Sequence, residues 1–161
     1  MKKCCVLILE NLRSVENTAS IFRTADAFKV SKIFLIGTTP TPLDRFGRKR
    51  QDFAKVSLEA EDTVDWEYVR NQDLEFKIQD LRDQGFQIIA LEQPPESKDL
   101  KSLLKPEKFV VIVGNEVEGV SKEVLSKADV IVEIPMMGEK ESLNVSVAAG
   151  VALFVLSSSE F

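Results

Sequence analysis

The chain of 161 residues carries 26 acidic and 21 basic side chains, which give a formal net charge of −5 at pH 7, and it is 44% hydrophobic and 29% charged. These values are typical of one globular domain, expected over residues 1–161, and they exclude a mainly disordered chain. The longest apolar run, residues 147–156, is shorter than the roughly 20 residues of a membrane span, which predicts a cytoplasmic protein without a membrane segment.

The first part of the chain predicts a strand, a helix and a second strand. Residues 6–10 form a short apolar run that favours a buried strand, and residues 32–36 repeat this pattern. Between them, from 12 to 28, apolar residues recur every three to four positions, which is typical of an amphipathic helix with Ser14 as its N-cap. The glycine and prolines of residues 37–42 then end regular structure.

The rest of the chain continues the alternation of helices and strands. In chain order it predicts a helix over 73–84, a strand over 86–91, a strand over 109–113, a helix over 121–127, a strand over 129–134 and a helix over 143–156. The strand runs are apolar at nearly every position, which indicates burial on both faces, as in a parallel sheet. We therefore predict an α/β domain in which helices flank a parallel sheet, with the strand order left open.

Cysteine and histidine usage restricts the chemistry. Cys4 and Cys5 are the two cysteines, and the chain has no histidine. Because neighbouring residues on a strand point to opposite faces, we expect two separate thiols and no disulfide between them. Two thiols without histidine form no zinc-type cluster, so no metal site is expected. The absence of histidine also excludes a Ser-His-Asp triad and removes the commonest general base.

A basic segment follows the proline-rich break, with an aromatic residue and a glycine among its cations. The four cations are Arg45, Arg48, Lys49 and Arg50. In a chain of net negative charge, a contact with nucleic acid requires such a local patch. Aspartates on both sides of the segment leave a second interpretation, a solvated loop whose charges are balanced.

Ligands of parallel sheets bind beyond the carboxyl ends of the strands, and three segments at such positions are unusual. The first contains Asn17 and Arg23, six residues apart on a predicted helix and therefore not on one line. The alternative for Arg23 is a surface arginine whose stem covers the core.

The second segment, residues 114–121, follows the most apolar predicted strand. Gly114 and Gly119 have the spacing of a phosphate-binding loop, but Val120 stands where that loop has its lysine. The carboxylates of Glu116 and Glu118 would also repel phosphates. The segment better suits a neutral or cationic ligand held by backbone groups.

The third segment, residues 134–146, joins the last predicted strand to the last helix. We expect Ser142 to cap that helix. Met136 and Met137 lie in the same loop, and such soft side chains suggest an apolar pocket for an adenine or a thioether, with ordinary packing as the alternative.

Taken together, residues 17–27, 114–121 and 134–148 resemble the three signature motifs of the SpoU (TrmH-like) RNA ribose 2′-O-methyltransferases of the SPOUT superfamily. The resemblance covers about residues 6–156. It implies an α/β domain whose C-terminal segment forms a deep trefoil knot, a homodimer with active sites near the interface, and S-adenosylmethionine as cofactor. We expect no appended RNA-binding domain, so the basic segment becomes the candidate for contacts with RNA phosphates.

The resemblance also assigns roles by position. Gly114, Ile134 and Leu143 match residues that contact S-adenosylmethionine, largely through backbone groups, and Met136 and Gly138 are expected to shape the same pocket. The residues matching those that position the nucleotide and brace the site are Asn17, Glu116, Ser142 and Asn144. Arg23 matches the arginine that activates the ribose 2′-hydroxyl. Because a guanidinium with a pKa above 12 is a poor base, a base role and electrostatic stabilisation of the alkoxide both stay open.

These expectations favour an S-adenosylmethionine-dependent enzyme that methylates a ribose 2′-hydroxyl of tRNA or rRNA. The alternative is a catalytically idle RNA-binding or assembly factor with the same fold. The joint presence of Arg23 and the polar residues of the second and third motifs argues against the idle factor. A small-molecule nucleotide-binding domain is disfavoured by the missing loop lysine.

Overall fold

Seven strands form one parallel sheet within residues 2–158, the part of the chain that this computed structural model describes. Their order across the sheet is β3-β2-β1-β6-β4-β7-β5. The strands are β1 (Cys4–Glu10), β2 (Lys32–Ile36), β3 (Trp66–Val69), β4 (Gln87–Leu91), β5 (Lys98–Asp99), β6 (Lys108–Gly114) and β7 (Val130–Glu133). The predicted α/β class with a parallel sheet is confirmed.

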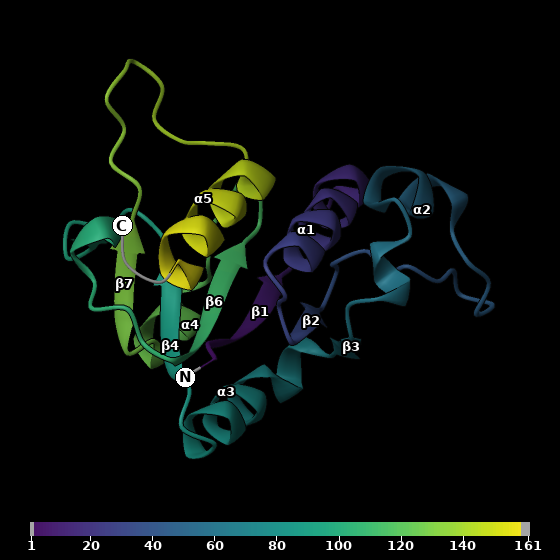
Figure 1. Ribbon diagram of the computed structural model, residues 1–161, viewed down its shortest axis with the longest axis horizontal. Helices are drawn as coiled ribbons and strands as arrows, with labels where there is room; N and C mark the ends of the chain where they lie inside the picture. Colours follow the sequence, from purple (N-terminus) through teal and green to yellow (C-terminus); the bar gives the residue numbers. More distant parts are fainter. Residues whose placement is uncertain (1, 159–161) are drawn as a thin grey trace.

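Helices cover both faces of this sheet (Figure 1). The α-helices are α1 (Val15–Ala27), α2 (Gln51–Ser57), α3 (Leu74–Asp83), α4 (Lys122–Lys127) and α5 (Val145–Ser157). Short 3-10 turns are η1 (Ala60–Asp62), η2 (Asn71–Asp73) and η3 (Leu100–Ser102). Helices α1, α2 and α5 lie on one face, and α3 and α4 lie on the other.

The alternation of side chains along the strands produces two apolar cores. Leu7 and Leu9 of β1 belong to the core beneath α1 and α5, whereas Val6 and Ile8 belong to the core beneath α3 and α4. Since successive residues of a strand point to opposite faces, a strand with helices on both sides is apolar at every position. This is why the central strands were readable from the sequence.

Helix caps confirm one prediction and correct another. Ser14 caps α1, where its Oγ accepts a hydrogen bond from the backbone N of Asn17 at 3.0 Å. The cap of α5 is Asn144, and the prediction of Ser142 was wrong. The helix begins two residues later than the sequence suggested, and Asn144 Oδ1 accepts from the Ser146 N at 2.8 Å.

Three elements were not predicted. Helix α2 has seven residues and follows the basic segment directly, so it shows little periodicity. Strand β3 is a half-exposed edge strand that contains a glutamate, and β5 has two exposed residues. Within the described residues, no helix is long and apolar enough to cross a membrane.

Candidate active site

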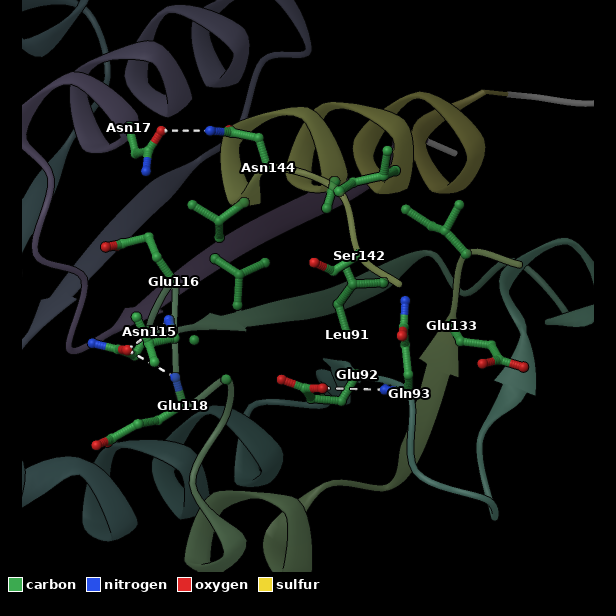
Figure 2. A pocket seen from close by; sticks show the side chains of 18 of the residues that line it. Asn17, Leu91, Glu92, Gln93, Asn115, Glu116, Glu118, Glu133, Ser142 and Asn144 are labelled. Atoms are coloured by element: carbon green, nitrogen blue, oxygen red, sulfur yellow. Dashed lines mark hydrogen bonds between the residues drawn. The ribbon is translucent and has the colours of Figure 1, made fainter. Parts of the chain in front are cut away.

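A cavity of about 480 Å³ opens at the carboxyl edge of the sheet, where β4, β6 and β7 end (Figure 2). Its volume falls within the roughly 300–1,000 Å³ of small-molecule sites. The lining comes from the segments that follow these three strands, together with the first turns of α1 and α5. The three segments singled out in the sequence therefore meet at one place.

Eight of the ten residues predicted as catalytic or cofactor-binding line this cavity. They are Asn17, Gly114, Glu116, Ile134, Met136, Ser142, Leu143 and Asn144. Arg23 and Gly138 are not among the lining residues. Arg23 is exposed on α1, and Gly138 is exposed in the loop between β7 and α5.

The loop that follows β6 is a tight turn around Asn115. Its Oδ1 accepts hydrogen bonds from the backbone N of Val117 at 2.8 Å and of Glu118 at 2.9 Å. Its Nδ2 donates to the carbonyl of Asn11 at 2.8 Å, which fastens the loop to the segment after β1. A Cβ on Gly114 would lie 2.3 Å from the backbone of Gly119, so the two ends of the turn approach as closely as they do because residue 114 is a glycine.

Glu92, directly after β4, holds the far end of the same loop and was not singled out in the sequence. Its Oε1 accepts from the backbone N of Val120 at 2.9 Å, and its Oε2 accepts from the N of Gln93 at 3.1 Å. Gly119 has a φ of +72°, and a Cβ there would meet Glu92 Oε1 at 2.0 Å. The available signal was a lone glutamate at the end of a predicted buried strand.

Two side-chain contacts connect the site to α1. The carboxylate of Glu116 accepts from the backbone N of Arg13 at 3.0 and 3.1 Å, just before the helix begins. Asn144 Nδ2 donates to Oδ1 of Asn17 at 3.1 Å, at the rim of the cavity (Figure 2). The residue before the cap of α1 is thereby bonded to the second motif segment, and the first turn of α1 is bonded to the third.

The charged groups of the lining are all acidic. They are Glu92, Glu116, Glu118 and Glu133, and no lysine or arginine is among the described residues that line the cavity. Such a lining repels phosphates and favours a neutral or positively charged ligand. Over residues 2–158, no group of three or more histidine, cysteine, aspartate or glutamate side chains could hold a metal ion.

The basic segment lies away from this cavity, at the end of the molecule beyond β2 and α2 (Figure 1). Three of its four predicted cations are paired with aspartates. The pairs are Arg48 with Asp44 at 3.0 Å, Lys49 with Asp62 at 2.9 Å and Arg50 with Asp52 at 2.8 Å. Arg45 makes no ion pair within the described residues, and its guanidinium lies over the ring of Phe46.

A parallel α/β sheet with a loop-built, acidic cavity at its carboxyl edge defines a small-ligand-binding domain of the open-sheet class. The chain belongs to the SpoU rRNA Methylase family, whose model matches residues 5–154. The resemblance inferred from the three motifs is confirmed.

Relatives of known name support the same family. The chain is 41% identical over 78 residues to the tRNA (guanosine(18)-2'-O)-methyltransferase of Aquifex aeolicus, a match that covers 48% of this chain and 37% of that protein. It superposes with a TM-score of 0.85 and 25% identity on the AdoMet-bound rRNA methyltransferase from Sinorhizobium meliloti, covering 97% of this chain and 56% of that one. The matched part of the chain thus corresponds to about a third of the first relative and to little more than half of the second.

A third relative has nearly the same length. A solved structure described as giving insights into the 2-OH methylation of C/U34 on tRNA has a TM-score of 0.78 and 25% identity, covering 96% of this chain and 94% of that chain. Nearly all of that chain therefore superposes on the fold described above.

Proposed function

We propose that this chain catalyses transfer of a methyl group from S-adenosylmethionine to a ribose 2′-hydroxyl of a tRNA or an rRNA. The observation that carries the proposal is the convergence of the three motif segments on one cavity of about 480 Å³. The names of the relatives, which include tRNA 2′-O-methyltransferases and an AdoMet-bound rRNA methyltransferase, support this activity and this cofactor.

The cavity suits S-adenosylmethionine in its chemistry. When bound, this cofactor supplies an electrophilic methyl group on a positively charged sulfur. The acidic lining favours that charge, and the glycine at position 114 lets the loop after β6 close tightly at the edge of the cavity. Gly114, Ile134, Met136 and Leu143 are the residues that we expect to hold the cofactor. Gly138 lies in the same loop as Met136 but does not line the cavity, so its expected part in the pocket is the weakest of these assignments.

Arg23 is the residue that we assign to the ribose. In this role its guanidinium orients the 2′-hydroxyl and stabilises the oxygen as negative charge develops there. The hydroxyl proton would pass to a carboxylate or an RNA phosphate as the oxygen takes the methyl group from sulfur, which would leave S-adenosylhomocysteine as the second product. Asn17, Glu116, Ser142 and Asn144 brace the cavity and position the nucleotide.

The position of Arg23 favours a homodimer. Arg23 is exposed and does not line the cavity of its own chain. If a second copy packs against α1 and α5, Arg23 of each copy can reach the cavity of the other. Helix α5 is apolar at nearly every position, yet its Val147 is 51% exposed. A helix that is apolar on all sides is normally covered, and a second copy supplies that cover. Val147→Glu is expected to yield monomers in sedimentation experiments, and an unchanged dimer would contradict this interface.

We also propose the C-terminal trefoil knot that the family resemblance implies. Its support is the path of the chain, which leaves β7, makes a long loop and returns to pack α5 against α1 and β6, on the far side of β4. A crystal structure whose chain cannot be pulled straight from its two ends would support the knot. A chain that straightens would refute it.

In this proposal, residues 1–161 bind RNA as one domain. Its basic contacts to RNA phosphates are made by Arg45, Arg48, Lys49 and Arg50. The solved relative of nearly equal length supports a catalytic unit of this size. The cytoplasm, where tRNA and rRNA are abundant, is the expected compartment. Charge reversal at Arg48 and Lys49 should raise the dissociation constant for RNA and flatten its salt dependence.

The experiment that tests this function combines binding and turnover. Isothermal titration with S-adenosylhomocysteine should give micromolar affinity with one site per chain. Arg23→Ala should abolish methyl transfer to RNA and leave this affinity unchanged, while Lys55→Ala, a change of an exposed lysine on α2, should alter neither. Absence of binding with and without RNA would refute the cofactor, and binding without transfer to any RNA would favour the idle RNA-binding factor.

A further inference from the structure

An ordered loop presents an aromatic side chain to solvent at the end of the molecule beyond α2. Leu43 and Lys49 pair as an antiparallel bridge, and the turn between them closes through Gly47, which has a φ of +76°. The backbone N of Asp44 donates to the carbonyl of Arg48 at 2.8 Å, and the N of Gly47 donates to the carbonyl of Asp44 at 2.9 Å. This segment, residues 43–49, is called the tip loop below.

The side chain of Asp44 fixes the interior of the tip loop. Its Oδ1 accepts from the backbone N of Phe46 at 2.8 Å and of Arg48 at 2.9 Å, and its Oδ2 accepts from Arg48 Nε at 3.0 Å. The hydrogen bonds from Arg48, followed by that from Phe46, hold the pKa of Asp44 below its ordinary value. The charged carboxylate of Asp44 thus accepts hydrogen bonds from two backbone positions of the loop and from one side chain.

The base of the tip loop is bonded to the body of the domain. Lys49 Nζ donates to Asp62 at 2.9 Å in η1, and the backbone N of Arg50 donates to the carbonyl of Pro42 at 2.9 Å. The charge of Lys49 is thereby paired with Asp62, and the guanidinium of Arg50 pairs with Asp52 at 2.8 Å. These pairs leave Arg45, at the tip, as the cation with no ion pair within the described residues.

Phe46 is the side chain that this scaffold displays. It is 66% exposed, and the guanidinium carbons of Arg45 and Arg48 lie 4.8 and 5.0 Å from its ring centroid. The ring contributes little to either apolar core, since it belongs to neither cluster of buried residues. An exposed aromatic ring held by an ordered loop and flanked by guanidiniums has the chemistry of a platform for a nucleobase.

We propose that Phe46, with Arg45 beside it, stacks on an unpaired nucleobase of the RNA substrate. This inference rests on the proposed function, and it adds a contact with a base to the expected contacts with phosphates. The tip loop lies away from the cavity of its own chain, so the stacked base is not a nucleotide bound in that cavity (Figure 1). Recognition of a distant unpaired base would let the domain choose among RNAs by the arrangement of their loops.

The surroundings of Phe46 favour RNA over a protein partner. The buried centre of a stable protein interface is about 65% apolar, although arginine is common there. Here the guanidiniums of Arg45 and Arg48 lie over the ring, Gly47 follows Phe46 in the sequence, and Leu43 is the other exposed apolar residue of the tip loop. Guanidiniums stack on bases and pair with phosphates, which suits single-stranded RNA.

Fluorescence polarisation with a short fluorescein-labelled oligouridine, and with bulk tRNA as a second ligand, tests this platform. Phe46→Ala should raise the dissociation constant for the oligouridine by about 5- to 100-fold, because one base stack is lost. Phe46→Trp should restore the affinity. Phe76→Ala, on α3, is the matched control because Phe76 is also an exposed phenylalanine, at 79% exposure. A duplex RNA of equal length should bind the wild type and Phe46→Ala equally.

The contrary outcomes are equally specific. If Phe46→Ala binds both RNAs as tightly as Phe76→Ala does, or if the wild type binds neither RNA, Phe46 is no base platform. If Phe46→Ala instead lowers the mass of the protein in sedimentation and leaves RNA affinity unchanged, the ring belongs to a contact between copies. Titration with S-adenosylhomocysteine separates the two proposals: retained cofactor binding and methyl transfer in Phe46→Ala, with unchanged RNA affinity, would overturn this inference alone.

Discussion

Asn144 Nδ2 lies 3.1 Å from Oδ1 of Asn17, so that the cap of the last helix is hydrogen-bonded to the first turn of the first helix across 127 positions of sequence. Asn144 also holds the N-terminus of α5 through the backbone N of Ser146. One side chain thus sets both where α5 begins and how its start lies against α1. In the proposed enzyme, this places the third motif beside the first.

The contribution of this hydrogen bond can be measured by a double-mutant cycle. Asn144→Ala should lower the free energy of unfolding by about 0.5–2 kcal/mol, because the helix loses its cap. Asn144→Ser keeps a capping oxygen and should lower the free energy of unfolding less. The shorter serine side chain still loses the hydrogen bond to Asn17. With Asn17→Ala, the cycle in urea denaturation should give a coupling energy of about 0.5–1 kcal/mol. Additive effects would show that the two amides do not interact.

The two predicted cofactor glycines should respond differently to a methyl group. Gly114→Ala brings a Cβ to 2.3 Å from the backbone of Gly119, which cannot yield without opening the turn. We expect a lower melting temperature and loss of S-adenosylhomocysteine binding. Gly138→Ala, where no atom lies within 4 Å of the added Cβ, should keep the melting temperature of the wild type. Equal destabilisation by both changes would contradict this geometry.

Glu92 is expected to act as a positioning residue for the loop after β6. Glu92→Ala leaves the N–H of Val120 without its acceptor, and because Val120 is buried, the free energy of unfolding should fall by about 1–3 kcal/mol, with weaker cofactor binding. Glu92→Gln retains an acceptor oxygen, so this variant should keep most of the stability and most of the affinity for the cofactor. Glu96→Ala, at an exposed position of the same connection, is the control. Identical titration curves for Glu92→Ala and wild type would refute the role.

The two cysteines should differ in their reactivity with iodoacetamide. Burial, followed by the neighbouring Cys4, raises the pKa of the Cys5 thiol far above its usual range, whereas Cys4 is only half-buried. In the native protein at mildly alkaline pH, mass spectrometry should detect alkylation at Cys4 and none at Cys5, and both should react once the chain is denatured. Rapid native alkylation of Cys5 would show that β1 opens.

The same shift has a consequence for stability. As the pH rises, the Cys5 thiol loses its proton at a higher pH in the folded state than in the unfolded state. Its contribution to the free energy of unfolding is therefore complete below the unfolded thiol pKa of about 8.5 and declines above it. The free energy of unfolding of the wild type should therefore fall on the alkaline side. Cys5→Ala should flatten that fall, and an unchanged slope would contradict the assignment to Cys5.

The sequence was informative where burial was complete. Strand β2 was predicted with its bounds, and β1 and β6 within two residues, because helices on both faces make central strands apolar throughout. Ser14 was recognised as a cap because capping is local chemistry. By contrast, β3 and β5 lie at the two ends of the strand order, where pairing depends on neighbours distant in sequence.

The candidate site shows the same division. The motif segments were recognised along the chain, but their convergence on one cavity depends on the order β6-β4-β7, which no local pattern contains. Glu92 was missed because its role is to accept from Val120, 28 residues away. The pairing of Lys49 with Asp62 was also not evident from the sequence. The sequence therefore suggested more unpaired cations in the basic segment than the fold leaves.

The central claim is methyl transfer to a ribose 2′-oxygen. The most direct measurement incubates the wild-type protein with S-adenosylmethionine and total RNA from cells in which its gene is deleted, then identifies the nucleosides by mass spectrometry after nuclease digestion. We predict one new nucleoside whose added methyl group resides on the ribose, absent when Arg23→Ala replaces the wild type. A methyl group on a base, or no new nucleoside from an enzyme that binds the cofactor, would contradict the claim.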